Sequence, residues 1–317
     1  MALKVAALAG GVGGAKMLDG LAHVLPADHL TAIVNTGDDF DHLGLRVCPD
    51  LDTVVYTLSG VSNPDTGWGR QGETWQFMNT LKSLGGPGWF QLGDQDLAMH
   101  VLRTEALNGG ASLSQVVRKF REMMGVAVEV LPMTDDRVPT IVETDEGDLD
   151  FQIYFVARRC EPKVTGFRFE GVEQSRPAPG VVEAIGQADV VIFCPSNPWV
   201  SLGPILAVPG IREAVAARPV VAVTPLVGGK AIKGPAAKMY IELGFNPEAS
   251  TVAEHLGELL DMFVLDEVDR EQASAIESRG VRVRVAQTVM QTPEDRVQLA
   301  EEVLEGASHL LSMEVKA

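Results

Sequence analysis

Short apolar runs alternate with segments of helical periodicity along most of this 317-residue chain, and this alternation constrains the fold more than any other feature. Each run has the length of a buried strand, and strands that alternate with helices form parallel sheets with helices on both faces. The pattern therefore predicts a three-layer, Rossmann-like α/β fold with a mostly parallel sheet. The runs are LKVAALA, LTAIVNT, VAVEVLPM, DVVIFCPS, PVVAVTPLV, DMFVLDE and VRVRVAQ.

Two regions depart from this alternation. Residues 67–125 hold ETWQFMNTLKSLGG and LSQVVRKFREMMG, which read as amphipathic helices with no strand between them and predict a small helical insertion. VPTIVETDEGDLDFQIYFVARR holds two strand-like runs around the turn residues 145–148, which predicts a β-hairpin. A last helix is expected at about PEDRVQLAEEVLEGASHLL. The length allows one large domain or two ordinary ones, and a single α/β domain over residues 1–317 is predicted.

Charge and cysteine content exclude several classes of function. The chain has 43 acidic and 26 basic residues and a net charge of -17, which disfavours a nucleic-acid surface or an anionic membrane as partner. The apolar N-terminal run is broken by Gly10 and Gly11, and ADVVIFCPSNPWVSLGPILAVPGI is interrupted by prolines, so neither a signal peptide nor a membrane span is expected. Three cysteines without a CxxC pair are typical of a reduced, cytoplasmic protein.

The stretch AGGVGGAK, Ala9–Lys16, follows the first apolar run and matches neither common phosphate motif. A P-loop requires a glycine at Ala15 and a hydroxyl at Met17, and a dinucleotide fingerprint requires a third glycine at Lys16. What remains is a strand that ends in glycines before a helix, whose free N–H groups attract an anion. A phosphate-type site at Gly10, Gly11, Gly13, Gly14 and Lys16 is predicted, with a plain strand-to-helix turn as the alternative.

Polar clusters follow almost every apolar run, at the point where the predicted strand ends. They are 36–39 (TGDD), 134–136 (TDD), 195–198 (PSNP) and 228–230 (GGK). Because the carboxyl ends of parallel strands lie along one edge of a sheet, these clusters are expected to converge on one site. Each cluster alone could instead form turns or cap helices, since Asp and Asn commonly do both.

Two aspartates in CPDLDTVVYTLSG, Asp50 and Asp52, suggest a divalent cation. Carboxylates beside a phosphate repel it unless a hard cation such as Mg²⁺ lies between them, although Asp50 could also simply cap a helix. Asp94 and Asp96 open another helical segment, with either role open. The histidines, including His23, His42 and His100, lack zinc-site spacing and are interpreted as surface or supporting residues. The residues thus predict an Mg²⁺-dependent enzyme with a phosphorylated, nucleotide-containing substrate.

Several motifs, in order and across nearly the whole chain, resemble a known family. GGVGGAKMLDGL, NTGDD, CPDLDTVVYTLSG, LGDQDLA, LPMTDDRVPT, PSNPWVSLGPIL and GGKAIKGPAAKM resemble the 2-phospho-L-lactate transferases of coenzyme F420 biosynthesis, called CofD in archaea and FbiA in actinobacteria. The resemblance implies transfer of a phosphorylated three-carbon acid from a guanosine diphosphate (GDP) adduct to the deazaflavin Fo. The products would be GMP and F420-0 or dehydro-F420-0, and the enzyme would be a homodimer.

The resemblance also implies roles for individual residues. Asp50 and Asp52 would form the metal and acceptor-hydroxyl site, with one of them as base. The glycine loop, Lys16, Ser196 and Asn197 would hold the nucleotide, and further substrate contacts would come from Asn35, Asp38, Gln91, Asp94, Gly228 and Gly229. Gln91 stands where the family often has lysine, which leaves that acceptor contact open. Trp68, Trp75 and Trp89 either cover the deazaflavin or serve packing.

A second class of function stays open at this level. A related branch, the gluconeogenesis factors, resembles this chain in the glycine loop and binds nucleotide sugars as a regulator. CPDLDTVVYTLSG after NTGDD favours the transferase, because the regulatory branch has a glycine- and serine-rich continuation there. The transferred acid could derive from lactate, phosphoenolpyruvate or glycerate, with the enolpyruvyl form favoured for a bacterial source.

Overall fold

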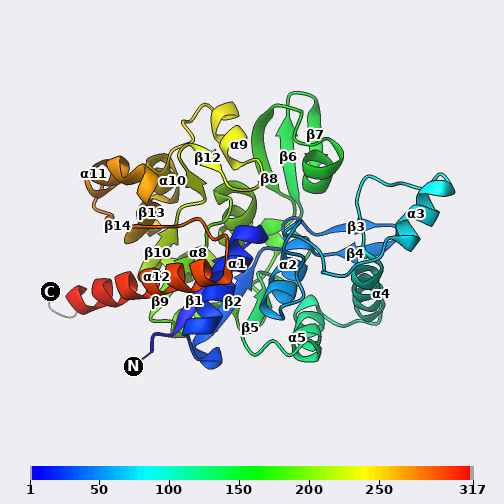
Figure 1. Ribbon diagram of the computed structural model, residues 1–317, viewed down its shortest axis with the longest axis horizontal. Helices are drawn as coiled ribbons and strands as arrows, with labels where there is room; N and C mark the ends of the chain where they lie inside the picture. The colour runs from blue at the N-terminus through cyan, green and yellow to red at the C-terminus, as the bar shows by residue number, and fades with distance from the viewer. Residues whose placement is uncertain (1, 315–317) are drawn as a thin grey trace.

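A seven-stranded parallel sheet forms the centre of the molecule, in a computed structural model that describes residues 2–314 (Figure 1). Its strand order is β14-β13-β10-β9-β1-β2-β5, and all six neighbouring pairs are parallel. Each of the seven predicted apolar runs supplies one strand, which confirms the predicted α/β class. The bounds are Val5–Ala9 (β1), Leu30–Val34 (β2), Glu129–Pro132 (β5), Val190–Phe193 (β9), Val220–Val223 (β10), Met262–Asp266 (β13) and Arg282–Ala286 (β14).

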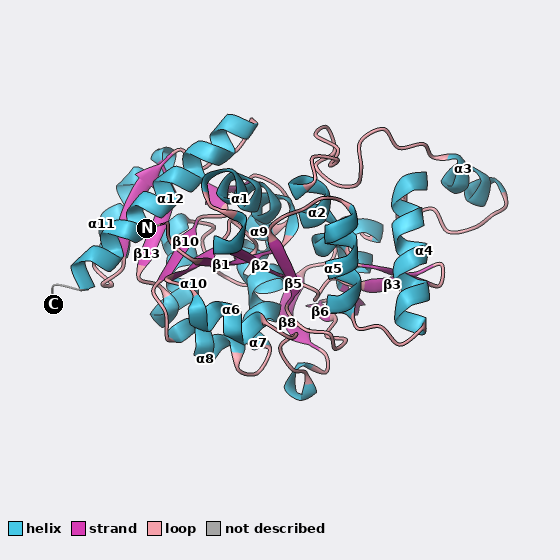
Figure 2. Ribbon diagram, turned by 90° about the horizontal axis from the view of Figure 1, so that it is seen from below, coloured by secondary structure: helices cyan, strands magenta, loops and turns pink. Residues whose placement is uncertain are grey.

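Helices cover both faces of this sheet, which gives the three layers seen edge-on in Figure 2. Strand β1 lies in the middle with every residue buried: Ala7 and Ala9 face one core cluster and Ala6 and Leu8 the other. One layer contains α1 (Gly11–Val24), α2 (Pro49–Leu58), α5 (Leu113–Met123) and α12 (Pro293–Glu314). The other contains α6 (Val181–Gln187), α7 (Gly203–Ala207), α8 (Ile211–Ala216), α9 (Ala236–Glu242), α10 (Ala249–Leu256) and α11 (Ala273–Glu277).

Residues 67–125 form three helices, of which α5 contributes buried side chains to the main core and α4 (Asp94–Asn108) packs only Leu107 against it. Helix α3 (Gln76–Ser83) lies farthest from the sheet in Figure 1 and buries only Met78, while α4 packs beside the hairpin of β3 (Phe40–His42) and β4 (Leu45–Val47). Helix α5 instead packs on β5 and places Leu113 and Val117 in the central core. No helix in this or any other described part of the chain is both long and apolar enough to cross a bilayer.

The predicted hairpin is present as β6 (Thr140–Thr144) and β7 (Gly147–Asp150), joined by β8 (Val164–Phe169) in a three-stranded antiparallel sheet. The second strand is shorter than predicted, because Ile153–Ala157 forms a π-helical turn. That turn buries Tyr154 against Val142 and Val164. The rings of Phe151 and Phe155 stack with centroids 5.6 Å apart, which a strand would not allow, because residues four apart in a strand are separated by about 13 Å.

Small further elements complete the chain. The antiparallel pair β11 (Leu226–Val227) and β12 (Lys230–Ala231) follows β10. The short helical turns are η1 (Ala27–His29), η2 (Ile153–Ala157), η3 (Val172–Gln174), η4 (Pro198–Leu202), η5 (Gly257–Leu259) and η6 (Glu267–Gln272).

Helices α1 and α12 pack so closely that one position must be glycine. A Cβ on Gly20 would lie 2.1 Å from the carbonyl oxygen of Arg296, and the Arg296 guanidinium reaches the Asp19 carboxylate at 2.9 Å. This contact fixes the last helix of the chain against the helix that follows β1.

We expect Gly20→Ala to lower the free energy of unfolding by about 1–3 kcal/mol, because the added methyl group forces α1 and α12 apart. Urea denaturation followed by circular dichroism measures this loss. Gly186→Ala in α6 is the matched control: its Cβ meets nothing within 4 Å, so helix propensity should make it neutral or slightly stabilising. Equal effects of the two substitutions would contradict the close approach.

Candidate active site

A cavity of about 560 Å³ opens along the carboxyl edge of the central sheet. Residues within three positions of the ends of five strands line it: Gly10 after β1, Asn35 after β2, Ser196 after β9, Thr224 after β10 and Thr288 after β14. The convergence expected for a parallel sheet therefore holds for the glycine loop and for the clusters 36–39 and 195–198, but not for 134–136 and 228–230. The predicted site residues in the lining are Gly10, Gly11, Gly13, Lys16, Asn35, Asp38, Asp50, Asp52, Gln91, Ser196 and Asn197.

Four of the predicted site residues lie outside this lining: Gly14, Asp94, Gly228 and Gly229. The Asp94 carboxylate accepts hydrogen bonds from the backbone N–H groups of Gln76 and Phe77, both at 3.1 Å, and so holds the start of α3. Gly228 and Gly229 have φ of +56° and +73° and turn the chain between β11 and β12. Gly14 is buried, and a Cβ there would lie 2.8 Å from Ser196 Oγ.

The cluster after β5 also faces away from the main cavity, because β5 is the edge strand. The Asp135 carboxylate accepts hydrogen bonds from the Ser114 backbone N–H at 2.6 Å and its hydroxyl at 2.9 Å, at the start of α5. Asp39, Asp135 and Asp136 line a separate small cavity. In this cluster Asp135 thus binds the first turn of α5.

The glycine loop packs between α2 and the segment after β9. A Cβ on Gly10 would lie 2.6 Å from Asp50 Oδ2, and one on Gly13 would lie 2.4 Å from the Pro195 carbonyl oxygen. Gly11 has φ +67°, and its N–H donates to Asp50 Oδ1 at 2.7 Å. Close packing thus explains why side chains are absent here, while the N-terminus of the 14-residue helix α1 still lines the cavity.

Asp50 does not cap its own helix. Helix α2 begins at Pro49, with Cys48 as its N-cap residue, and the Asp50 carboxylate reaches across to Gly11 and to Asn35 Nδ2 at 3.0 Å. Asn35 Nδ2 also lies 3.4 Å from Asp38 Oδ1, so one amide group bridges two carboxylates. Gln152 from the turn after β7 donates to Asp38 Oδ2 at 3.2 Å.

The paired carboxylates of Asp38 and Asp50 are buried and repel each other. Burial, and next the charge of Asp50, raises the pKa of Asp38 well above its ordinary value, and burial raises the pKa of Asp50 to about 6. A hard cation between the two oxygens would remove this repulsion, and carboxylates are the ligands that Mg²⁺ prefers. The chemistry of this donor set therefore fits a magnesium ion.

Asp52 points into a different environment, although it lies only two residues further along α2. Both of its carboxylate oxygens pair with the guanidinium of Arg103, which is only 2% exposed, with Arg103 NH1 at 3.0 Å from Oδ2. Positions two apart on a helix point about 200° apart, so one ion cannot easily use both aspartates. The structure therefore divides the predicted Asp50/Asp52 pair and places Asp38 beside Asp50.

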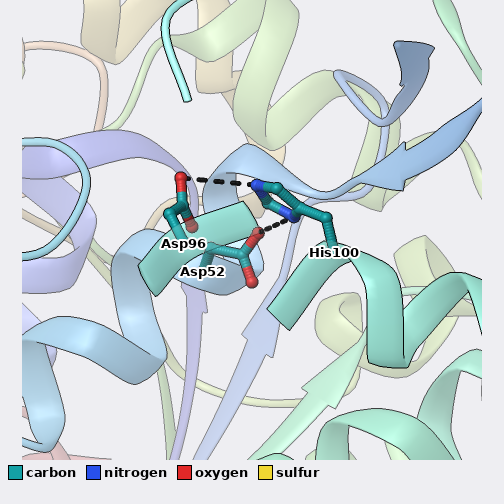
Figure 3. Close-up of side chains that lie close together, drawn as sticks. All are labelled: Asp52, Asp96 and His100. Carbon is teal, nitrogen blue, oxygen red and sulfur yellow. Dashed lines mark ion pairs between the residues drawn. The ribbon is translucent and has the colours of Figure 1, made fainter. Parts of the chain in front are cut away.

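Asp52, Asp96 and His100 form a second polar cluster on the cavity wall (Figure 3). His100 Nδ1 lies 3.7 Å from Asp52 Oδ2, and His100 Nε2 lies 3.3 Å from Asp96 Oδ2. Sequence reasoning did not assign Arg103 or a functional role to His100. One sequence pattern could have indicated both residues. Asp96, His100 and Arg103 are spaced i, i+4 and i+7, which puts all three on one face of α4.

Aromatic side chains form another part of the lining. Trp68, Trp89, Phe90, Phe151 and Phe155 all contribute, and Trp89 packs edge-on against His42 with ring centroids 5.0 Å apart. Trp75 does not line the cavity but packs edge-on against Trp68 at 6.4 Å. Gln91 lies in the wall, and the Lys82 ammonium donates to its side-chain oxygen at 3.1 Å.

Comparison with known proteins identifies the family. Residues 5–304 match the family model described as 2-phospho-L-lactate transferase CofD. The chain belongs to the CofD family. An alignment of 316 positions with a phosphoenolpyruvate transferase of Streptomyces griseus shows 45% identity and covers 97% of this chain and 99% of the relative. A 2-phospho-L-lactate transferase of Methanosarcina mazei is 38% identical over 296 residues, 93% and 98% of the two chains.

This CofD-family assignment confirms the resemblance carried by the sequence motifs, and because the relatives are transferases, the chain is a transferase. A crystal structure of a UPF0052 family member from Bacillus halodurans has a TM-score of 0.63 at 18% identity, covering 95% of this chain and 99% of that one. At this identity the likeness concerns the fold alone, and it agrees with the central parallel sheet.

We expect Arg103→Met to lower the free energy of unfolding by about 3–5 kcal/mol, because it leaves the buried Asp52 carboxylate without its partner. In Asp52→Asn/Arg103→Met the loss should be clearly smaller than the sum of the single losses. Chemical denaturation measures all three, with Arg118→Met on the exposed face of α5 as the control. A loss no larger than that of the control would show that the ion pair does not stabilise the fold.

Proposed function

We propose that this CofD-family protein transfers a phosphorylated three-carbon acid from a guanosine diphosphate adduct to the deazaflavin Fo. One observation carries the proposal: a glycine-lined helix N-terminus, a pair of buried carboxylates and an aromatic wall all face the same cavity. These features match, in order, a diphosphate, a divalent cation and a flat aromatic acceptor. The products are GMP and F420-0 or its dehydro form.

The nucleotide side of the donor belongs at the glycine loop. Gly10, Gly11 and Gly13 present backbone at the start of α1, where the helix dipole favours anions. Lys16 lies one turn further on, and its ammonium donates to the Met290 carbonyl oxygen at 2.6 Å. Burial, and then the positive charges of Arg296 and Lys233, lower the pKa of Lys16. A bound diphosphate would compensate this concentration of positive charge, and Ser196 and Asn197 complete the same wall.

Asp38 and Asp50 would hold the Mg²⁺ ion. When bound, the ion would offset the charge of the diphosphate and lower the pKa of the acceptor hydroxyl. Asn35 and Gln152 keep both carboxylates in place through the hydrogen bonds described above. Asp52 has no part in this site, because Arg103 already neutralises it.

In the proposed reaction the primary hydroxyl of the acceptor attacks the β-phosphorus of the donor. One phosphorus–oxygen bond forms to the acceptor, and the bond to the bridging oxygen breaks, so that oxygen leaves with GMP. The proton lost by the hydroxyl balances the charge gained by the released phosphate. Positioning and charge neutralisation supply most of the rate in transfers of this kind, which suits a cavity that holds both substrates along one sheet edge.

The donor acid that we propose derives from phosphoenolpyruvate, which would make dehydro-F420-0 the product. The Streptomyces griseus relative, named a phosphoenolpyruvate transferase, is 45% identical to this chain, whereas the Methanosarcina mazei 2-phospho-L-lactate transferase is 38% identical. A pocket distinguishes one small apolar group by about 1–3 kcal/mol, so turnover of the lactate analogue is expected at a reduced rate.

Purified protein supplied with Fo, Mg²⁺ and each guanosine adduct in turn tests the proposal. We expect mass spectrometry to find dehydro-F420-0 as the main product, with the enolpyruvyl adduct giving the highest kcat/KM by about 10-fold or more. Without Fo no product of that mass should form. A protein that accepts none of the three adducts and instead binds a nucleotide sugar would overturn the transferase proposal.

Metal removal tests the role of the paired carboxylates. We expect EDTA to abolish turnover and Mg²⁺ to restore it, and Asp38→Asn and Asp50→Asn each to lower kcat by orders of magnitude while the circular dichroism spectrum is retained. Asp28→Asn, an exposed aspartate ahead of β2, serves as the control and should keep full activity. Full activity of Asp38→Asn or Asp50→Asn would show that the substituted residue does not hold the metal ion.

A further inference from the structure

The Asp96 carboxylate is fixed from several sides and still lines the cavity. The Tyr56 hydroxyl donates to Asp96 Oδ1 at 2.6 Å, and His100 Nε2 lies 3.3 Å from Asp96 Oδ2 (Figure 3). The backbone N–H of Asp96 donates to Glu73 Oε1 at 2.8 Å. The proposed metal site and nucleotide site use none of these groups, so this part of the wall has a separate role.

The protonation of His100 follows from its neighbour Arg103. Arg103 NH1 lies 3.1 Å from His100 Nδ1, and a guanidinium can only donate, so Nδ1 is an acceptor and the ring proton sits on Nε2. That N–H faces Asp96. With Arg103 also bound to Asp52, both ring nitrogens and both Asp52 oxygens have protein neighbours. This arrangement does not suit a metal ion at Asp52, Asp96 and His100.

The network therefore ends in an ionised carboxylate at the cavity surface. Although burial opposes it, His100 and Tyr56 lower the pKa of Asp96. A carboxylate oxygen can accept two hydrogen bonds, so Asp96, which lines the cavity, can accept a further one. A negative charge repels the phosphates of the donor, so this wall suits a substrate that brings neutral hydroxyl groups. Trp89 and Phe90, a few residues earlier in the chain, line the same cavity and offer flat surfaces to an aromatic ring.

We propose that Asp96 binds the acceptor by accepting a hydrogen bond from a hydroxyl of its side chain, and that Tyr56 and His100 are positioning residues that hold this carboxylate. The inference rests on the proposed function, because it assigns a wall of the same cavity to the hydroxylated aromatic acceptor. It makes Asp96 a determinant of acceptor binding and leaves the donor to the glycine loop and Lys16.

Binding titrations with Fo fluorescence test this assignment in the full-length protein. We expect Asp96→Asn to weaken Fo binding about 10- to 100-fold, because a hydrogen bond to a charged group is lost, while the Kd for GDP stays within about twofold. Glu105→Gln, a carboxylate-to-amide change on the exposed side of the same helix, is the matched control and should bind both ligands as the wild type does.

Two further measurements identify the contact. A deazaflavin with a methyl group in place of the hydroxylated chain should bind wild type and Asp96→Asn equally, because the hydroxyl partner is missing from both complexes. Tyr56→Phe, which keeps the ring but removes the donor to Asp96, should raise the acceptor KM a few-fold and leave the donor KM unchanged.

Unchanged Fo binding by Asp96→Asn would overturn this inference and leave the transferase proposal standing. Weaker GDP binding with normal Fo binding would also overturn it, because the carboxylate would then contact the guanine or its ribose. If the wild type neither binds Fo nor turns it over, the proposed function and this inference both fail.

Discussion

The close packing of the Gly10–Gly11 backbone against Asp50 is the contact on which the rest of the site depends. Strand β1 lies between β2 and β9, so the segment that leaves it is confined on both sides. Without side chains at this point, Asp50 can accept the Gly11 N–H, and Ser196 can bond to the backbone of Gly10 at 3.1 Å for its N–H and 2.9 Å for its carbonyl. These bonds connect β1, α2 and the segment after β9 at one corner of the cavity, and a Cβ at Gly10 would collide with Asp50 Oδ2 and the side chain of Ser201.

Acidic and basic side chains occupy different parts of the cavity. Asp38 and Asp50 are buried side by side, and within residues 2–314 the only side chains that donate to them are the amides of Asn35 and Gln152. Two buried negative charges without a positive partner destabilise the fold unless a cation or protons neutralise them. Asp52, on the same helix, is neutralised permanently by Arg103. Lys16 stands near Arg296 and Lys233 at the glycine loop. In a chain with a net charge of -17, this local positive charge distinguishes the anion side of the cavity from its surroundings.

The sheet could be predicted from the sequence because its strands are buried on both faces and read as continuous apolar runs. All seven runs became strands, because the pattern that marks a buried strand is formed by residues that are neighbours in the chain. The site was predictable where a polar cluster followed a central strand, as with Asn35 after β2 or Ser196 after β9. It was not predictable at Asp135, because periodicity does not reveal that β5 lies at the edge of the sheet. Nor does a local pattern show that Asp52 meets Arg103, a partner 51 residues away.

The two halves of the cavity come from parts of the fold with different constraints. The glycine loop and the segments after β9 and β14 extend from the central sheet, and an added side chain there can meet backbone, as the contact of Gly13 with the Pro195 carbonyl oxygen illustrates. Three other lining residues lie outside the central core clusters: Trp89 and Phe90 precede α4, and Asp96 lies in the first turn of α4. A substitution there would alter one wall of the cavity without contacting the central sheet. Under the proposed function, the phosphate and metal sites would therefore stay unchanged while the recognition of the second substrate changes.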